Sequence, residues 1–452
     1  MDTQIVSGGS KNVHPYDTEE CTPLLFNNSI NKDESGQGGK TSTAGAVFIV
    51  INACIGAGLL NFPHAFQSAG GIVVGVIVQL VLLVVITSSL LVLAKCSHIH
   101  QCSTYQEVVH KMCGQTGLFV CNITILLYCF GTSITFMIII GDQIDSFLEF
   151  IVSDSLGQWY TNRKFTLSIF SVIVVLPLCI PKAIDFLKYS SGIGVLGSIY
   201  VCAIVVIKYF TNGAAEGIHV ATSPDNWQDV FIAVPAICFG FQCHISSIPV
   251  YASLKKRTVS QFSKVCIIAL FLAFTTYTLT GIFGSLTFGT SSCSDILKSY
   301  DADDISVTIA RIMIGASVLT AYPILHFCGR VVINDLQIKI FKLTPEQVED
   351  GEVRRRIVQT IIWFSLSLIL ALFIPSIGVV ISVIGGLAAV FIFIFPGLCM
   401  IEYAMHYYDG SIRRKHLLIG CGIAWVGLGT FILGESTTLS IMDDVNGVTL
   451  AC

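Results

Sequence analysis

Residues 51–63 read INACIGAGLLNFP, and this stretch decides how the rest of the chain is interpreted. It lies in an apolar run from 43 to 66, which is long enough to cross about 30 Å of hydrocarbon as a helix. Gly56 and Gly58 make unwinding easier, and Pro63 removes a backbone donor. The segment therefore predicts a membrane-spanning helix that breaks near its middle.

A second apolar segment has the same character. Residues 239–249 read FGFQCHISSIP, again with glycine, proline and polar side chains inside a predicted span. Backbone groups freed by a break within the bilayer must find partners in a protein cavity. Glycine and proline are also common in membrane helices as packing and kink residues. Because both segments carry polar side chains as well, we favour a functional cavity over simple kinks.

The composition predicts an all-α polytopic membrane protein. Of the 452 residues, 53% are hydrophobic and only 12% are charged, which is more apolar surface than a soluble fold can bury. We expect eleven transmembrane helices, at 43 to 66, 71 to 94, 117 to 141, 165 to 181, 189 to 210, 229 to 252, 264 to 288, 305 to 328, 357 to 374, 377 to 401 and 417 to 439.

The order of these spans suggests two halves. The two broken segments are five spans apart, as expected if five spans form one repeat and the next five a copy of inverted topology. The predicted units are a disordered cytosolic tail with a sorting signal (1–42), a first five-helix repeat (43–210), a second repeat (229–401), and an eleventh helix with a lumenal C-terminus (417–452). Most of the 25 Lys and Arg residues fall on the side of the N-terminus, which predicts that this side is cytosolic.

Other functional classes find less support. Most of the 17 cysteines lie in apolar spans, and none forms a CxxC pair with metal spacing. The intramembrane histidines have no HExxH partner, so we predict neither an enzyme nor an organic cofactor. No acidic ring or charged voltage-sensing helix indicates a channel. Nothing in the chain indicates a nucleic-acid partner.

Several motifs in order resemble a known family. They are 52–60 (NACIGAGLL), 240–244 (GFQCH) with Pro249 and Tyr251, 322–330 (YPILHFCGR), and 384–386 (IGG) with 395–397 (FPG). The chain resembles the amino acid/auxin permease family from residue 41 to about 437, and within it the sodium-coupled neutral amino acid transporters, closest to a lysosomal, glutamine-transporting member. The resemblance implies the LeuT fold, with ten core helices in two inverted halves and one extra helix. It also implies alternating-access transport of neutral amino acids with Na⁺ or H⁺ coupling, and an amino acid sensor on the same fold is the alternative.

A zwitterionic substrate needs groups of both polarities at the breaks. Exposed N–H groups at a half-helix terminus suit its carboxylate, and exposed carbonyls suit its ammonium group. Spans one, three, six and eight contain no buried Asp or Glu to pair with a cationic side chain, which favours neutral substrates. The predicted substrate-binding residues are Gly56, Ala57 and Gly58 for the carboxylate, and Ala53, Phe239, Gly240 and Phe241 for the ammonium group.

The coupling ion suggests a second set of residues. In the fold that the chain resembles, sodium lies between the unwound part of helix one and hydroxyl groups of helix eight, which match Asn52, Ser317 and Thr320. A mid-span hydroxyl also commonly bonds the carbonyl four residues earlier. His244 is a candidate for pH sensing or proton coupling because histidine changes charge near neutral pH, and the alternative is a neutral packed histidine. His326 is expected to be structural.

The N-terminal tail carries a candidate sorting signal. Residues 20–25 read ECTPLL, and Glu20, Leu24 and Leu25 match an acidic dileucine signal that a cytosolic adaptor binds. We therefore expect a multi-pass protein of the lysosomal membrane, with the plasma membrane as the alternative.

Overall fold

The apolar runs of the sequence form long helices in the computed structural model. It describes residues 39, 41–151, 158–182, 190–215, 217–374 and 376–445. The tail signal at Glu20, Leu24 and Leu25 lies outside these residues. The α-helices are α1 (Thr43–Cys54), α2 (Phe62–Ser68), α3 (Ile72–His100), α4 (Tyr105–Ile151), α5 (Arg163–Phe170), α6 (Leu176–Cys179), α7 (Ser190–Asn212), α8 (Asp229–Gly240), α9 (His244–Ser253), α10 (Val259–Phe288), α11 (Ile305–Phe341), α12 (Pro345–Asp350), α13 (Glu352–Phe373), α14 (Ile377–Ala389), α15 (Phe395–His406) and α16 (Ile412–Val445).

Ten of the eleven predicted spans meet a simple length and hydropathy criterion. Among the described residues, nine helical segments are long and apolar enough to cross a membrane, and α1 with the helix after its break, bent by 48°, forms a tenth. The remaining predicted span, 165 to 181, is present as α5, a π-helical turn and α6, of 8, 5 and 4 residues. The π turn interrupts the regular helix, so no single helix there is long enough to meet the criterion.

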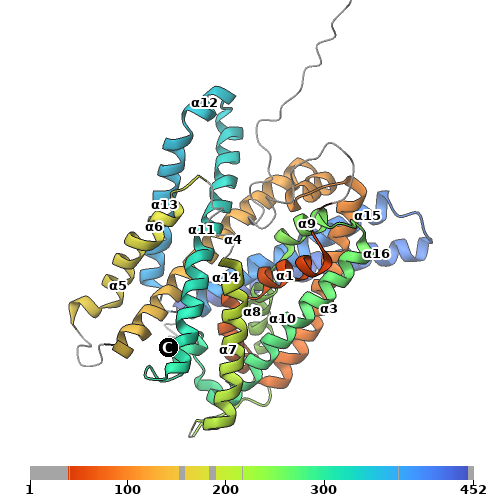
Figure 1. The fold of residues 1–452 in the computed structure, drawn as a ribbon. Helices are drawn as coiled ribbons and strands as arrows, with labels where there is room; N and C mark the ends of the chain where they lie inside the picture. Colours follow the sequence, from red (N-terminus) through yellow and green to blue (C-terminus); the bar gives the residue numbers. More distant parts are fainter. Residues whose placement is uncertain are drawn as a thin grey trace, which may run out of the picture.

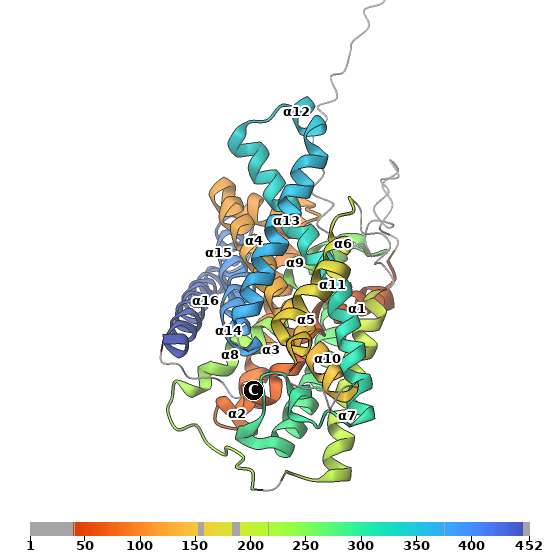
Figure 2. The same cartoon turned by 90° about the vertical axis from the view of Figure 1, so that its left-hand side faces the viewer.

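The broken segment α8–α9 lies in the interior of the bundle, and α16 lies outside it. Figure 1 shows α1, α8 and α9 among the other helices, and Figure 2 shows α16 along one side, next to α15. Burial agrees, because 78% of the most apolar window of the α8–α9 segment is buried, against 17% for α16. The exposed apolar side chains of α16, such as Ile423 and Phe431, are the ones expected to contact acyl chains.

The start of α1 is attached to the end of α9. The backbone N–H of Thr41 donates to the carbonyl of Ser253 at 3.0 Å, and the N–H of Lys255 donates to the carbonyl of Thr41 at 3.0 Å. Ser42 caps α1 by accepting a hydrogen bond from the N–H of Gly45. The outer ends of the two broken helices are therefore joined to each other.

The cysteines of the helices behave mainly as packing residues. Most of those in the described helices are buried, as small apolar side chains are. Cys293, in the connection between α10 and α11, is disulfide-bonded. No group of three or more His, Cys, Asp or Glu side chains in the described part of the chain is placed to hold a metal ion.

Candidate functional site

The first break separates α1 from a 3₁₀ helix, η2 (Ala57–Asn61). Ile55 is extended, at φ −74° and ψ 108°, and so is Gly56, at φ −155° and ψ −152°. Pro63 lies in the first turn of α2, where its missing N–H and restricted φ fit a helix start. The chain thus leaves the α-helix for two residues and then resumes a helical path.

The second break separates α8 from α9. Phe241, Gln242 and Cys243 connect the two helices, with Phe241 at φ −94° and ψ 9° and Cys243 at φ −129° and ψ 4°. The N–H of Phe241 still donates to the carbonyl of Ile237 at 3.0 Å, and the N–H of Gln242 donates to that of Phe239 at 3.3 Å, so the helix tightens at its end. Each break brings together a helix end whose last carbonyls, and a helix start whose first N–H groups, lie outside the regular α-helical hydrogen-bond pattern. The predicted breaks at both segments are present.

Tyr277 of α10 connects the two breaks. Its hydroxyl oxygen lies 2.7 Å from the carbonyl oxygen of Cys54, at the end of α1, and 2.8 Å from that of Gly240, at the end of α8. One hydroxyl has a single proton, so it donates to one carbonyl at a time. The ring of Tyr277 stacks on Phe62, with ring centroids 4.2 Å apart. Helix ends from both segments are thereby held by one side chain.

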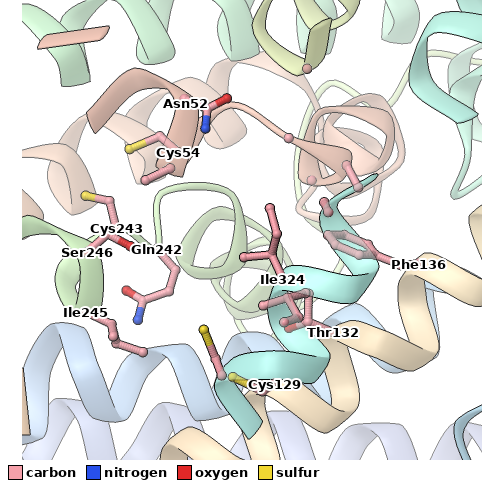
Figure 3. A pocket seen from close by; sticks show the side chains of 18 of the residues that line it. Asn52, Cys54, Cys129, Thr132, Phe136, Gln242, Cys243, Ile245, Ser246 and Ile324 are labelled. Atoms are coloured by element: carbon pink, nitrogen blue, oxygen red, sulfur yellow. The ribbon is translucent and has the colours of Figure 1, made fainter. Parts of the chain in front are cut away.

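A cavity of about 280 Å³ lies between the breaks and helices α4 and α11. Figure 3 shows side chains of α1, α4, α11 and the α8–α9 connection around it. Of the predicted substrate-binding residues, Ala53, Gly56, Ala57, Gly58 and Phe239 line this cavity. None of the described residues that line it is an Asp, Glu, Lys or Arg.

Two predicted substrate-binding residues do not line the cavity. Gly240 and Phe241 lie behind its wall, because the ring of Phe241 packs against Tyr277 at 5.1 Å and Phe62 at 6.5 Å. The carbonyl oxygen of Gly240 lies 2.8 Å from the hydroxyl of Tyr277, on the side of the core. Gly240 and Phe241 therefore face the core, and the chain reaches the cavity again at Gln242 and Cys243.

Sequence reasoning missed one wall of the cavity. Tyr128, Thr132 and Phe136 of α4 line it, together with Gln242 and Ser246 from the second break. The three α4 residues are four positions apart and therefore share one helix face. This spacing is the signal that was available in the sequence, although an apolar span gives no indication of which face meets the breaks.

The three candidate cation ligands lie together on the cavity wall. Asn52, Ser317 and Thr320 all line the cavity. A Cβ atom added to Gly194 of α7 would lie 2.8 Å from Ser317 Oγ and 3.8 Å from Asn52 Oδ1, so these two oxygens converge near Gly194. The Thr320 hydroxyl lies within hydrogen-bond distance of the carbonyls of Ala316 (3.1 Å) and Ser317 (2.9 Å), and its lone pairs remain able to bind a cation. Carbonyl and hydroxyl oxygens are suitable ligands for a hard cation.

The two histidines differ in their surroundings. His244 is fully buried and does not line the cavity, but its ring contacts Gln242, which does. His326 packs edge-on against Trp363 at 5.9 Å, and its ring nitrogens have no hydrogen-bond partner among the described residues. His244 is therefore connected to the cavity through the side chain of Gln242.

Comparison with known proteins connects this geometry to a family. A family model described as transmembrane amino acid transporter protein matches residues 39–407. Sodium-coupled neutral amino acid transporter 7 of Danio rerio is 48% identical over 424 residues, which cover 92% of this chain and 90% of that protein. The Homo sapiens protein of the same name is 47% identical over 412 residues, covering 90% and 89%. Solute carrier family 38 member 8 of Homo sapiens is 38% identical over 410 residues, covering 89% and 94%.

A solved structure supports the architecture. The crystal structure of MhsT in complex with L-phenylalanine aligns with a TM-score of 0.54 and 15% identity, covering 89% of this chain and 100% of that one. At this identity the likeness shows the fold alone, and it confirms the predicted LeuT-like helical fold. The family is one of transporters, which confirms the prediction that the protein is not an enzyme. The chain belongs to the transmembrane amino acid transporter family, because that family's model matches most of its length.

Proposed function

We propose that this protein transports neutral amino acids, glutamine or asparagine in particular, across the lysosomal membrane by alternating access with Na⁺ or H⁺ coupling. One observation carries the proposal: two helix breaks with helix ends of both polarities border one uncharged cavity. The starts of η2 and α9 offer N–H groups to a carboxylate, and the ends of α1 and α8 offer carbonyls to an ammonium group. A free amino acid carries both groups.

The residues that line the cavity favour a substrate with a neutral side chain. No Asp, Glu, Lys or Arg is among the described residues that line the cavity. A substrate with a charged side chain would therefore lose its hydration on binding and gain no opposite charge in return. The related proteins named as sodium-coupled neutral amino acid transporters support the same substrate class and Na⁺ as coupling ion. The convergence of Asn52 and Ser317 near Gly194 offers this chain oxygens for such an ion.

Counterflow in proteoliposomes tests the function. Liposomes loaded with unlabelled glutamine should accumulate labelled glutamine transiently when they contain the protein, and this exchange should saturate. A sensor on the same fold would bind glutamine without accelerating its exchange, and a channel would give flux without counterflow. Absence of counterflow from protein that elutes as a folded monodisperse species would reject the proposal.

A further inference from the structure

Gln242 lies between His244 and the cavity, and its two amide ends have different surroundings. Gln242 Oε1 lies 3.4 Å from the backbone nitrogen of His244 and 3.0 Å from its Nδ1. Gln242 Nε2 has no hydrogen-bond partner among the described residues. The residue is only 8% exposed, yet it lines the cavity. A buried amide donor is therefore available at the cavity wall.

The orientation of this carboxamide follows from hydrogen-bond chemistry. A backbone N–H only donates, so the atom of Gln242 that faces it must be the oxygen. This oxygen can then accept from Nδ1 of His244 only if Nδ1 carries a proton. The remaining ring nitrogen, Nε2, then accepts the proton of the Ser89 hydroxyl on α3, whose oxygen lies 2.7 Å from Nε2 and 2.9 Å from the carbonyl oxygen of Ile86. His244 is thus held on both sides, and it holds the carboxamide with its nitrogen directed away from itself.

Figure 3 shows the Gln242 carboxamide extending from the second break toward the part of the cavity that Cys129 and Ile245 also line. Two of the hydroxyl groups that line the cavity offer weaker alternatives as donors. The Thr132 hydroxyl donates to the carbonyl of Tyr128 at 2.8 Å, and that of Thr320 donates within its own helix. Their protons are already used, whereas both protons on Gln242 Nε2 are unpaired within the described structure.

We infer that Gln242 determines specificity by donating a hydrogen bond from Nε2 to a side-chain carbonyl oxygen of the substrate, with His244 and Ser89 as positioning residues. The inference rests on the proposed function and refines it. A substrate side chain that ends in an amide would satisfy this donor, and an apolar side chain of similar length would leave it unpaired. Sites built around a hydrogen bond reject analogues that lack the partner.

The substitution Gln242→Met tests the donor while keeping a side chain of similar length. In counterflow, we expect the preference for glutamine over methionine to fall roughly tenfold or more, the order expected for one buried hydrogen bond. Transport of alanine, whose side chain does not reach a distant donor, should change little. An equal loss for glutamine, methionine and alanine would overturn the inference, because it would mean that Gln242 serves the α-carboxylate or the fold.

A matched control is available at Gln79 of α3. This glutamine is also buried, but its two ends pair with Thr278 and the carbonyl of Phe274, and it does not line the cavity. Gln79→Met should therefore leave the ratio of glutamine to methionine transport unchanged, whatever its effect on expression. If Gln79→Met changed this ratio as much as Gln242→Met, the effect would be one of general destabilisation and the inference would fail.

The positioning role of His244 has its own readout. His244→Asn supplies an amide N–H in place of Nδ1–H, whereas His244→Ala supplies none. We expect His244→Asn to retain more of the preference for glutamine over methionine than His244→Ala, at equal amounts of folded protein. Equal ratios in both variants would remove His244 from this role. If the wild-type protein catalyses counterflow but every variant keeps the wild-type ratio of glutamine to methionine transport, only this inference is rejected. If the wild-type protein shows no counterflow, the proposed function is rejected.

Discussion

Gly58, in the first helix break, packs against Gly240, the last residue of α8. A Cβ atom added to Gly58 would lie 3.0 Å from the Cα atom of Gly240 and 3.4 Å from the ring of Phe239. Gly56, two residues earlier, differs, because an added Cβ there would meet no heavy atom of the described structure within 4 Å. Its φ of −155° is one that any residue adopts. Only Gly58 is required for contact between the breaks.

Substituting Gly58 should therefore destabilise the protein more than substituting Gly56. We expect Gly58→Ala to separate the two breaks and to lower the free energy of unfolding by about 1–3 kcal/mol, as overpacking does. Gly56→Ala meets no protein atom, so it should cost little stability, whereas its methyl group would reduce the space in the cavity that Gly56 lines. Apparent melting temperatures of the two variants provide the measurement, and the reverse order of stability would contradict the packing described here.

Tyr277→Phe should loosen both breaks without removing the ring that stacks on Phe62. The hydroxyl bonds the carbonyls of Cys54 and Gly240, and a buried polar group left without its partner costs about 1–3 kcal/mol. We expect slower counterflow per folded molecule. Tyr322→Phe is the control, since its hydroxyl pairs with Ser367, away from the breaks. If the two variants lost transport equally, the hydroxyl of Tyr277 would have no special connection to the breaks.

Asn52→Ala should weaken cation dependence and amino acid transport together. If its side-chain oxygen binds the coupling ion, filling the ion site organises the adjacent break, and the coupling is reciprocal. Raising the Na⁺ concentration should then partly restore substrate affinity. Gly194→Ala should act similarly, because its methyl group would lie 2.8 Å from Ser317 Oγ. Uptake measured against Na⁺ concentration decides the matter, and an unaltered dependence per folded molecule would refute the ion site.

Asp295, in the connection between α10 and α11, should make stability depend on pH. Burial and the neighbouring Asp142 raise the pKa of the Asp295 carboxyl to about 7, against the opposing effects of Leu297 N–H, Lys298 and Gln143. The folded state then retains a proton that the unfolded state releases above its ordinary Asp pKa of about 4. The free energy of unfolding should therefore fall as pH rises from about 4 to 7, by on the order of 2–4 kcal/mol.

The substitution Asp295→Asn checks this sign. The variant keeps an oxygen acceptor but cannot ionise, so its apparent melting temperature should change less between about pH 5 and pH 7 than that of the wild type. The wild type should be the less stable of the two at the higher pH. Parallel melting curves for the two proteins across this range would exclude Asp295 as the group responsible.

Replacing Leu24 and Leu25 with Ala should redistribute the protein from lysosomes toward the plasma membrane. An adaptor that recognises one acid and two leucines loses its apolar contacts in this variant, whereas replacing Thr22 leaves those contacts in place. Co-localisation with a lysosomal marker and surface biotinylation provide the measurement. A double variant that stays in lysosomes would show that residues 20–25 are not the lysosomal sorting signal.

The sequence alone determined that this is a helical membrane protein and where its helices break. Partition of a segment into the bilayer depends on the summed hydrophobicity of about 20 consecutive residues, and unwinding depends on local glycine, proline and polar content. Both are properties of a short stretch of chain. The breaks at 51–63 and 239–249 and ten of the eleven spans could therefore be predicted without tertiary information.

Only the tertiary structure decided which groups face the cavity. It directed Gly240 and Phe241 into the core, brought one face of α4 to the breaks, and turned the donor end of Gln242 away from His244. The α3 residue Ser89 and His244 are 155 positions apart, yet their side chains form a hydrogen bond. Such contacts depend on how the helices rotate and pack against one another, and a uniformly apolar span carries no local signal of that rotation.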